Sequence, residues 1–271
     1  MNPTPETDYC RDKAIPDGSA MYYASMYYPK EQHRKICALH ALKHELMDIC
    51  NSSDPGVAYI KFAWWKEELL RLAENEPRHP VTREFLDIPD LGLDKRLHGT
   101  MFQLTEFYES LINPESYKSI DDLLDYVLRG VQNYWEFVAN VCVYYHPHTP
   151  DIVARLGSQY ELFLIIQNRL LRRNINLDAF RNNSDANTHS YEYLVKFLQD
   201  GFQVYLQRLP RRDAYNQLHI IILTQIACAT CQEMIAGGSQ LEHELIHLTP
   251  LRKLWIAWRN YRKYKNTNYI R

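Results

Sequence analysis

The chain has 271 residues, of which 46% are hydrophobic and 13% aromatic, and it contains 20 tyrosines but only 9 glycines. This composition supplies apolar side chains for a large core and few of the turns that sheets need, which favours a globular helical protein. The formal net charge of −2 excludes an overall basic protein that attracts nucleic acid. We therefore expect no nucleic-acid partner.

The first residues (MNPTPETDYC) have neither the basic start and apolar run of a secretory signal nor the arginine-rich pattern of a mitochondrial presequence. The longest apolar stretch, 220–231, is interrupted by Thr224 and Gln225 and is shorter than the roughly 20 residues of a membrane-spanning helix. We therefore expect a cytoplasmic protein that is soluble or peripheral to a membrane, with its six cysteines reduced.

Apolar residues recur at helical spacing in eight windows, and none of the windows shows the alternation of a strand. Short breaks that contain Pro, Gly or Asn separate most windows and suit connections between antiparallel helices, whereas 174–188 is long and polar and is predicted to be a flap. The pattern predicts a single all-α domain over 1–271 with eight or nine helices. The windows are 31–50, 57–73, 94–111, 119–145, 151–172, 189–208, 212–236 and 251–263.

Several short blocks carry a family resemblance that spans nearly the whole chain. They are 9–14 (YCRDKA), 18–23 (GSAMYY), 38–41 (ALHA), 54–58 (DPGVA), 64–69 (WWKEEL), 79–81 (HPV) and 251–255 (LRKLW). Together the blocks resemble the squalene/phytoene synthase family, and most closely its bacterial presqualene diphosphate synthase branch. The resemblance implies an isoprenoid-synthase type of helical bundle around an apolar central cavity, with a prenyl diphosphate or another isoprenoid lipid as ligand.

The resemblance also implies two aspartate-rich motifs on facing helices, which in catalytic relatives hold magnesium ions against the substrate diphosphate. The first motif resembles D-D-x-x-D and should follow Ala41. There the chain keeps Asp48, within 47–51 (MDICN), and Glu45 one turn earlier. Most carboxylates of the first motif are therefore missing.

The second motif should follow Gly157, but the chain reads ELFLIIQNRLLR over 161–172, which leaves Asn168 and Arg172 as its remnants. Arg169, Arg172 and Arg173 lie at helical spacing where the resemblance places metal ligands. Guanidinium groups repel magnesium, but they suit phosphate oxygens. These three arginines are candidates for binding an anionic group without a metal.

Five further positions are singled out by the same resemblance. Ser19, Tyr22 and Arg34 match positions near the diphosphate in relatives, so they are candidate anion-binding residues. Gln132 and Trp135 align with small residues that line the prenyl pocket, which implies that side chains fill part of the cavity.

The acids of the first motif leave three interpretations open. In the first, Glu45 and Asp48 are structural acids that pair with Arg169 or Arg172 across the former site. In the second, the arginines bind an anionic head group directly. In the third, Asp48 and Glu45 retain magnesium-dependent catalysis, with Asp48 as a metal ligand.

The C-terminal segment 251–271 contains seven Lys and Arg residues and no acid, interleaved with Trp255, Trp258, Tyr261 and Tyr264. Basic residues mixed with Trp and Tyr suit an anionic membrane surface. The alternative is a solvated last helix whose tryptophans face the core.

Two metal-like motifs are predicted to be structural. His243-Glu244-x-x-His247 matches the zinc-binding H-E-x-x-H pattern, but no third ligand follows and Pro250 breaks the helix. Cys228 and Cys231 form a lone C-x-x-C inside an apolar helical pattern, which is typical of buried small residues.

These observations predict a non-catalytic homologue that binds a lipid or isoprenoid, or assists assembly of a protein partner, as a peripheral protein on the inner face of a membrane. No cofactor is expected. The family includes mitochondrial complex I assembly factors without the full aspartate set, which offers a precedent by analogy. The alternatives are an active magnesium-dependent prenyltransferase or farnesyl diphosphate phosphatase, and an inactive partner of an active synthase.

Overall fold

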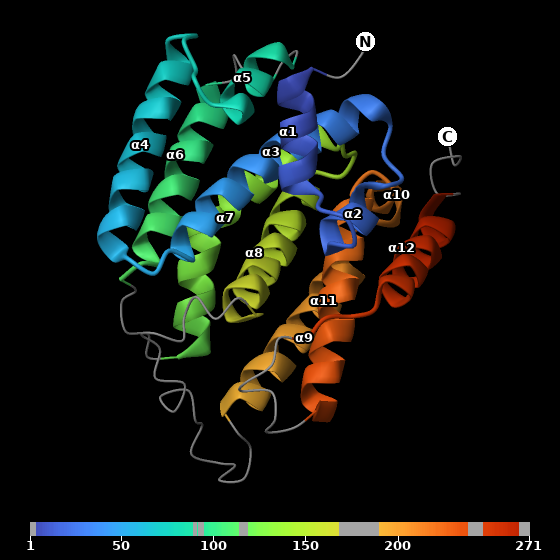
Figure 1. The fold of residues 1–271 in the computed structure, drawn as a ribbon. Helices are drawn as coiled ribbons and strands as arrows, with labels where there is room; N and C mark the ends of the chain where they lie inside the picture. Colours follow the sequence, from blue (N-terminus) through green and yellow to red (C-terminus); the bar gives the residue numbers. More distant parts are fainter. Residues whose placement is uncertain are drawn as a thin grey trace.

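The computed structural model describes residues 4–88, 91, 95–113, 119–167, 190–237 and 246–265. Within these residues the chain forms helices and no strand, which confirms the predicted all-α class (Figure 1). The predicted flap at 174–188 lies outside the described residues. The helices are α1 (Pro5–Ala14), α2 (Ala20–Ser25), α3 (Lys30–Cys50), α4 (Pro55–Ala73), α5 (Pro80–Asp87), α6 (Lys95–Ser110), α7 (Ile120–Val141), α8 (Thr149–Gln167), α9 (Ser190–Arg208), α10 (Arg211–Ala214), α11 (Leu218–Gly237) and α12 (Pro250–Tyr264).

The eight long helices follow the predicted windows, except that the window 212–236 merges α10 with α11, which begins only at Leu218. Helices α1, α2 and α5 were not predicted because they are short. Two of these short helices are nonetheless marked by capping chemistry. The Thr4 side chain accepts a hydrogen bond from the Thr7 N–H at the start of α1, and Ser19 does the same for Tyr22 at the start of α2. Such caps satisfy N–H groups that the first turn of a helix leaves unpaired.

Helix α7 ends four residues before its predicted window does. Val143 adopts a positive φ of 63°, which no helix continues through. The loop that follows is held by the buried carboxylate of Asp213, which accepts hydrogen bonds from the N–H groups of Tyr145 at 2.8 Å and His146 at 3.0 Å. A buried acid on α10 thus replaces the pairing that the helix would have supplied.

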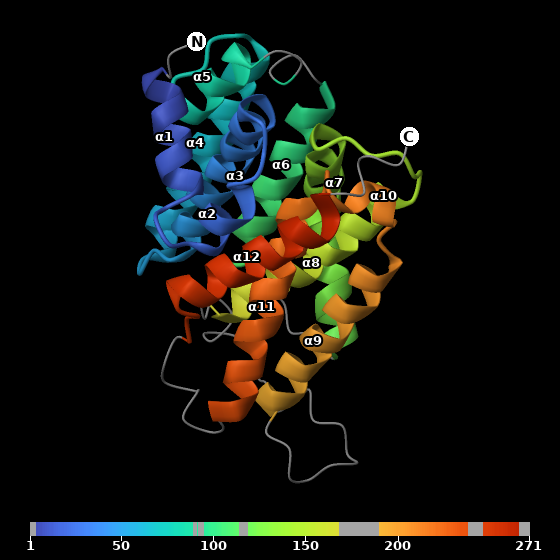
Figure 2. The ribbon, with the colours of Figure 1, turned by 90° about the vertical axis from the view of Figure 1, so that its right-hand side faces the viewer.

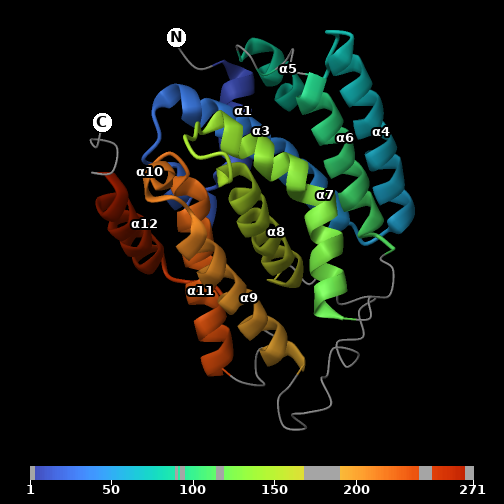
Figure 3. The ribbon, with the colours of Figure 1, turned by 180° about the vertical axis from the view of Figure 1, so that it is seen from behind.

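Helices α3, α7 and α8 form the middle of the bundle, with α7 packed along α8. Helices α4, α5 and α6 lie on one side, while α9, α11 and α12 lie on the other, so that α4 and α12 occupy opposite edges (Figures 1 and 3). The α8 side chains are buried along most of the helix, which places α8 at the core.

The described segment Leu218–Ala236 of α11 is long and apolar enough to cross a membrane by length and composition. It is longer than the stretch 220–231 noted in the sequence because its mean hydropathy of 1.4 is reached despite Thr224 and Gln225. Within the fold 78% of the segment is buried, as is typical of the core helix of a bundle.

Candidate functional site

A central pocket lies between α3, α8 and α11, and its volume is about 230 Å³. Helix α3 contributes His40, Lys43, His44 and Met47, which are spaced at i, i+3, i+4 and i+7 and therefore share one face. The remaining lining residues are Ser19, Ala20, Met21, Tyr160, Phe163, Leu164, Gln167, Leu223, Ile226, Ala227, Thr230, His247, Leu248 and Lys253.

A buried ion pair joins α3 to α8 beside this pocket. The Lys43 ammonium donates to the Glu161 carboxylate at 2.6 Å, and both side chains are only 1% exposed. The second carboxylate oxygen of Glu161 accepts a hydrogen bond from the Tyr108 hydroxyl at 2.9 Å. Burial and the nearby Glu161 raise the pKa of Tyr108 well above its ordinary value, so the phenol remains a donor. The negative charge of Glu161 is therefore already paired within the protein.

Trp135 fills the bundle next to the pocket. Its ring is fully buried and packs against His40, with ring centroids 5.5 Å apart, and against Tyr160 at 6.3 Å. A Cβ at Gly157 would come within 2.1 Å of the indole, so α8 needs a glycine there to accommodate the ring. The central pocket, about 230 Å³, is smaller than the roughly 300–1,000 Å³ of ordinary ligand sites.

The two α3 histidines at the pocket, His40 and His44, are held neutral by their surroundings. Burial, together with the charge of Lys43, lowers the pKa of His40 well below its ordinary value, and it lowers that of His44 to about 3. Among the described residues that line the pocket, Lys253 is the one cation without a carboxylate partner. Its ammonium donates a hydrogen bond to the Gly18 carbonyl at 2.8 Å, and burial lowers its pKa. The described lining residues include no Asp or Glu, so this part of the pocket wall carries no negative charge.

The first-motif acids do not line the central pocket. Lys13 of α1 bridges them, with its ammonium 3.0 Å from Glu45 and 2.8 Å from Asp48, and the Tyr9 hydroxyl donates to Glu45 at 2.6 Å. Both acids instead line a separate pocket of about 210 Å³ that faces α4 and includes Trp64. Lys13 is thus the structural partner of these acids.

The described residues do not fit a magnesium site of the kind that the resemblance implies. Magnesium takes hard oxygen ligands, usually carboxylates. The α3 face at the pocket offers two neutral imidazoles, an ammonium and a thioether, and Glu161 is already bonded to Lys43 and Tyr108. No group of three His, Cys, Asp or Glu side chains is placed to hold a metal within the part of the chain that the structure describes.

The three candidate anion-binding residues of the N-terminal part are not brought together. Ser19 lines the central pocket, although its hydroxyl is used to cap α2. Tyr22 packs edge-on against Tyr23. Arg34 forms two hydrogen bonds with the buried carboxylate of Glu84, at 2.6 and 2.9 Å.

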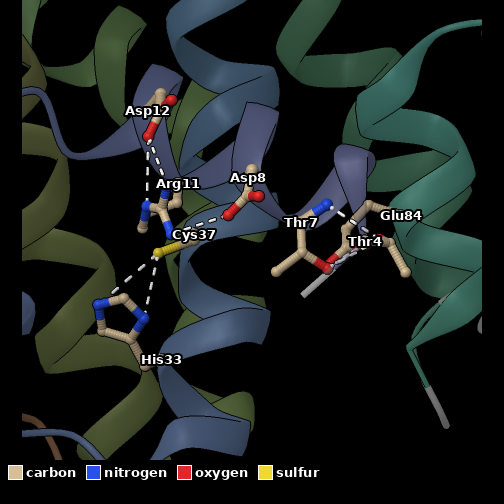
Figure 4. A network of polar contacts seen from close by, with 8 residues as sticks. All are labelled: Thr4, Thr7, Asp8, Arg11, Asp12, His33, Cys37 and Glu84. Carbon is tan, nitrogen blue, oxygen red and sulfur yellow. Dashed lines mark hydrogen bonds and ion pairs between the residues drawn. The ribbon is translucent and has the colours of Figure 1, made fainter. Parts of the chain in front are cut away.

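Arg34 lines a different and larger cavity, of about 890 Å³, between α1, α3 and α5. There the Thr7 hydroxyl of α1 donates to Glu84 of α5 at 3.0 Å, while Arg11 of the same helix pairs with Asp8 and Asp12 (Figure 4). Glu84 thus links α5 to both α1 and α3 through Thr7 and Arg34.

Several predicted site residues lie outside the described residues, namely Asn168, Arg169, Arg172 and Arg173, along with His243 and Glu244. The structure therefore shows neither the pairing of the acids with these arginines nor their use in anion binding. Cys228 and Cys231 are buried thiols of α11, and burial raises the pKa of each to about 12.

Sequence reasoning missed Lys43, Glu161 and Lys13 as partners. A signal for the first was present, because Lys43 interrupts the apolar face of the window 31–50 at a core position. A charged residue at such a position requires a buried partner. The sequence alone does not indicate which of the 33 acids that partner is.

Comparison with known families gives one match. The squalene/phytoene synthase model matches residues 17–168, which cover more than half of the chain and include α2 to α8. No curated protein matches the sequence. The match covers α3 and α8, which contribute to the central pocket, and the position of the first motif, whereas α11 lies outside it. The helical bundle agrees with the isoprenoid-synthase type of fold. The chain therefore belongs to the squalene/phytoene synthase family.

Proposed function

We propose that this chain is a non-catalytic member of the family, which binds a lipid or isoprenoid, or assists a protein partner, as a peripheral protein on the cytoplasmic face of a membrane. The observation that carries the proposal is the placement of the first-motif acids. Glu45 and Asp48 are bridged by Lys13 and face α4, whereas the α3 face at the central pocket presents Lys43 and His44.

The electrostatics support this proposal. Catalysis in the family depends on metal ions that stabilise a leaving diphosphate, and such charge stabilisation supplies several kcal/mol. A site that offers ammonium and neutral imidazole groups does not replace the missing carboxylates. The Lys13 ammonium between Glu45 and Asp48 can, however, replace a bound cation in its structural role, because it offsets the repulsion between the two acids and holds α1 against α3.

The size of the pocket supports a binding role different from that of the catalytic relatives. Members of the family bind prenyl diphosphates. A pocket of about 230 Å³ beside a buried Trp135 suits part of one apolar chain rather than two whole prenyl substrates. The ligand class we propose is therefore a single isoprenoid or lipid chain with an anionic head group.

The test is release of diphosphate from farnesyl diphosphate by the purified full chain, with and without magnesium. The Asp48→Asn variant is assayed beside a matched control, Asp12→Asn, which removes an exposed aspartate of α1. We expect no magnesium-dependent release from any of the three proteins. Release by the wild type and the control that is lost in Asp48→Asn would establish a catalytic metal site and overturn the proposal.

A second measurement addresses binding directly. Titration of the protein with farnesyl diphosphate in the presence of a magnesium chelator, followed by thermal stabilisation, tests a metal-free site. We expect farnesyl diphosphate to raise the unfolding temperature of the protein in the presence of the chelator, and we expect added magnesium to produce no further increase. Stabilisation that appears only with magnesium would favour the active enzyme.

A further inference from the structure

The outer face of α12 carries an exposed apolar stripe. Leu251 is 79% exposed and Trp255 is 56% exposed, and Leu254 and Trp258 are 39% and 38% exposed. These positions recur at i, i+3, i+4 and i+7, so they form one continuous face of the helix. The alternative in which the tryptophans face the core does not match this placement. Helix α12 lies across the outside of the bundle in front of α11 (Figure 2).

The opposite face of α12 fixes the helix to the body of the protein. Ile256 and Ala257 are buried against α11 and α2. Tyr261 stacks on Tyr27, with ring centroids 4.2 Å apart, and Lys253 donates to the Gly18 carbonyl. The stripe is therefore presented by a rigid helix.

Cations continue the stripe toward the C-terminal end of the helix. Arg259, Arg262, Lys263 and Lys265 form no ion pair with any residue that the structure describes. Three of them lie over aromatic rings instead: Arg262 over Trp258 at 5.1 Å, Lys263 and Lys265 over neighbouring tyrosines. The face thus combines exposed tryptophan with cations that lack anionic partners.

We propose that this α12 face docks on a bilayer that contains anionic lipids, with Leu251, Trp255 and Trp258 at the level of the head groups. Tryptophan prefers the membrane interface, and each basic residue near an anionic surface strengthens attachment. The inference rests on the membrane part of the proposed function and names the contact and the lipid class. It is independent of whether the central pocket is catalytic.

Charge complementarity separates this occupant from a second copy of the chain. In a twofold dimer the same patch meets itself, so Arg259 and Arg262 would oppose identical cations. The segment 250–271 contains no acid that could neutralise them. An anionic lipid surface supplies the missing charge and also accepts the apolar stripe.

The test is flotation of the full chain with vesicles of phosphatidylcholine, with and without phosphatidylglycerol. Two double variants probe the face, Arg259→Gln/Arg262→Gln and Trp255→Ala/Trp258→Ala. Matched controls are Lys95→Gln, an exposed cation of α6, and Ile60→Ser, a 72% exposed apolar residue of α4 on the opposite edge. Circular dichroism establishes that each variant is folded.

We expect salt-sensitive binding to the anionic vesicles only. Loss of two cations should weaken binding roughly 25-fold, at about fivefold for each, and the controls should bind like the wild type. Bromine-labelled lipids should quench fluorescence in the wild type and not in Trp255→Ala/Trp258→Ala. Binding that survives both α12 variants would overturn this inference while leaving the membrane role. Absence of binding by the wild type would overturn both, and the diphosphate assay would still decide the catalytic question.

Discussion

Replacement of Lys43 by Met should destabilise the protein far more than the same replacement of an exposed lysine would. The change removes the ammonium that lies 2.6 Å from Glu161, in a place where both side chains are 1% exposed. It leaves a buried carboxylate with only the Tyr108 hydroxyl as a described donor. Breaking a buried pair in this way costs about 3–5 kcal/mol of the free energy of unfolding.

The double variant Lys43→Met/Glu161→Met should lose much less than the sum of the single changes. Both charges are then absent, and apolar side chains of similar length occupy the space. The remaining cost is about 1–3 kcal/mol, because Tyr108 loses its acceptor. Adding Tyr108→Phe should recover part of it. Urea denaturation at pH 7, followed by circular dichroism, measures the free energy of unfolding of the wild type and of all four variants.

The decisive result is how the loss of stability in the double variant compares with the sum of the losses in the two single variants. If the double variant loses as much as the two single changes together, the ion pair is not the reason that each residue matters. Single variants that lose less than about 1 kcal/mol, as exposed pairs do, would show that water reaches the pair in solution. Either result would refute the reasoning from burial.

Three further predictions concern the same core. Gly157→Ala should cost about 1–3 kcal/mol because its Cβ would overlap the Trp135 ring, and Trp135→Leu should relieve the clash in a double variant measured by thermal unfolding. His40, His44 and His219 are all lowered in pKa, chiefly by burial, with His44 and His219 lowered to about 3. The unfolded chain therefore binds more protons below about pH 6.5, so stability should fall by about 4 kcal/mol between pH 7 and 5.5; a flat profile would contradict this, and His219→Asn should remove about a third. Asp213→Ala should cost about 2–4 kcal/mol and speed amide exchange in the loop 142–148.

Much of the helical fold could be predicted because long amphipathic windows carry a strong periodic signal. The window 57–73 corresponds to α4, and 251–263 corresponds to α12. The end of α7 could not be predicted, since it depends on Asp213, which lies about 70 positions away in the sequence. Short helices such as α2 offer too few residues for periodicity to detect.

The candidate site was predictable only in part. Motif loss could be recognised from the sequence, whereas the filling of the prenyl cavity by Trp135 stays a prediction. The direction in which Glu45 and Asp48 point could not be recognised, because it depends on the packing of α1 against α3. Lys13 comes from a helix that periodicity did not detect, so its bridge between the two acids had no sequence signal.

The buried pair between Lys43 and Glu161 also constrains how this chain can change over many generations. A change to another residue type at either position has to pass through a single replacement that leaves one charge buried alone. That intermediate would lose about 3–5 kcal/mol from a total stability of about 5–15 kcal/mol. The two positions are therefore expected to change together or not at all.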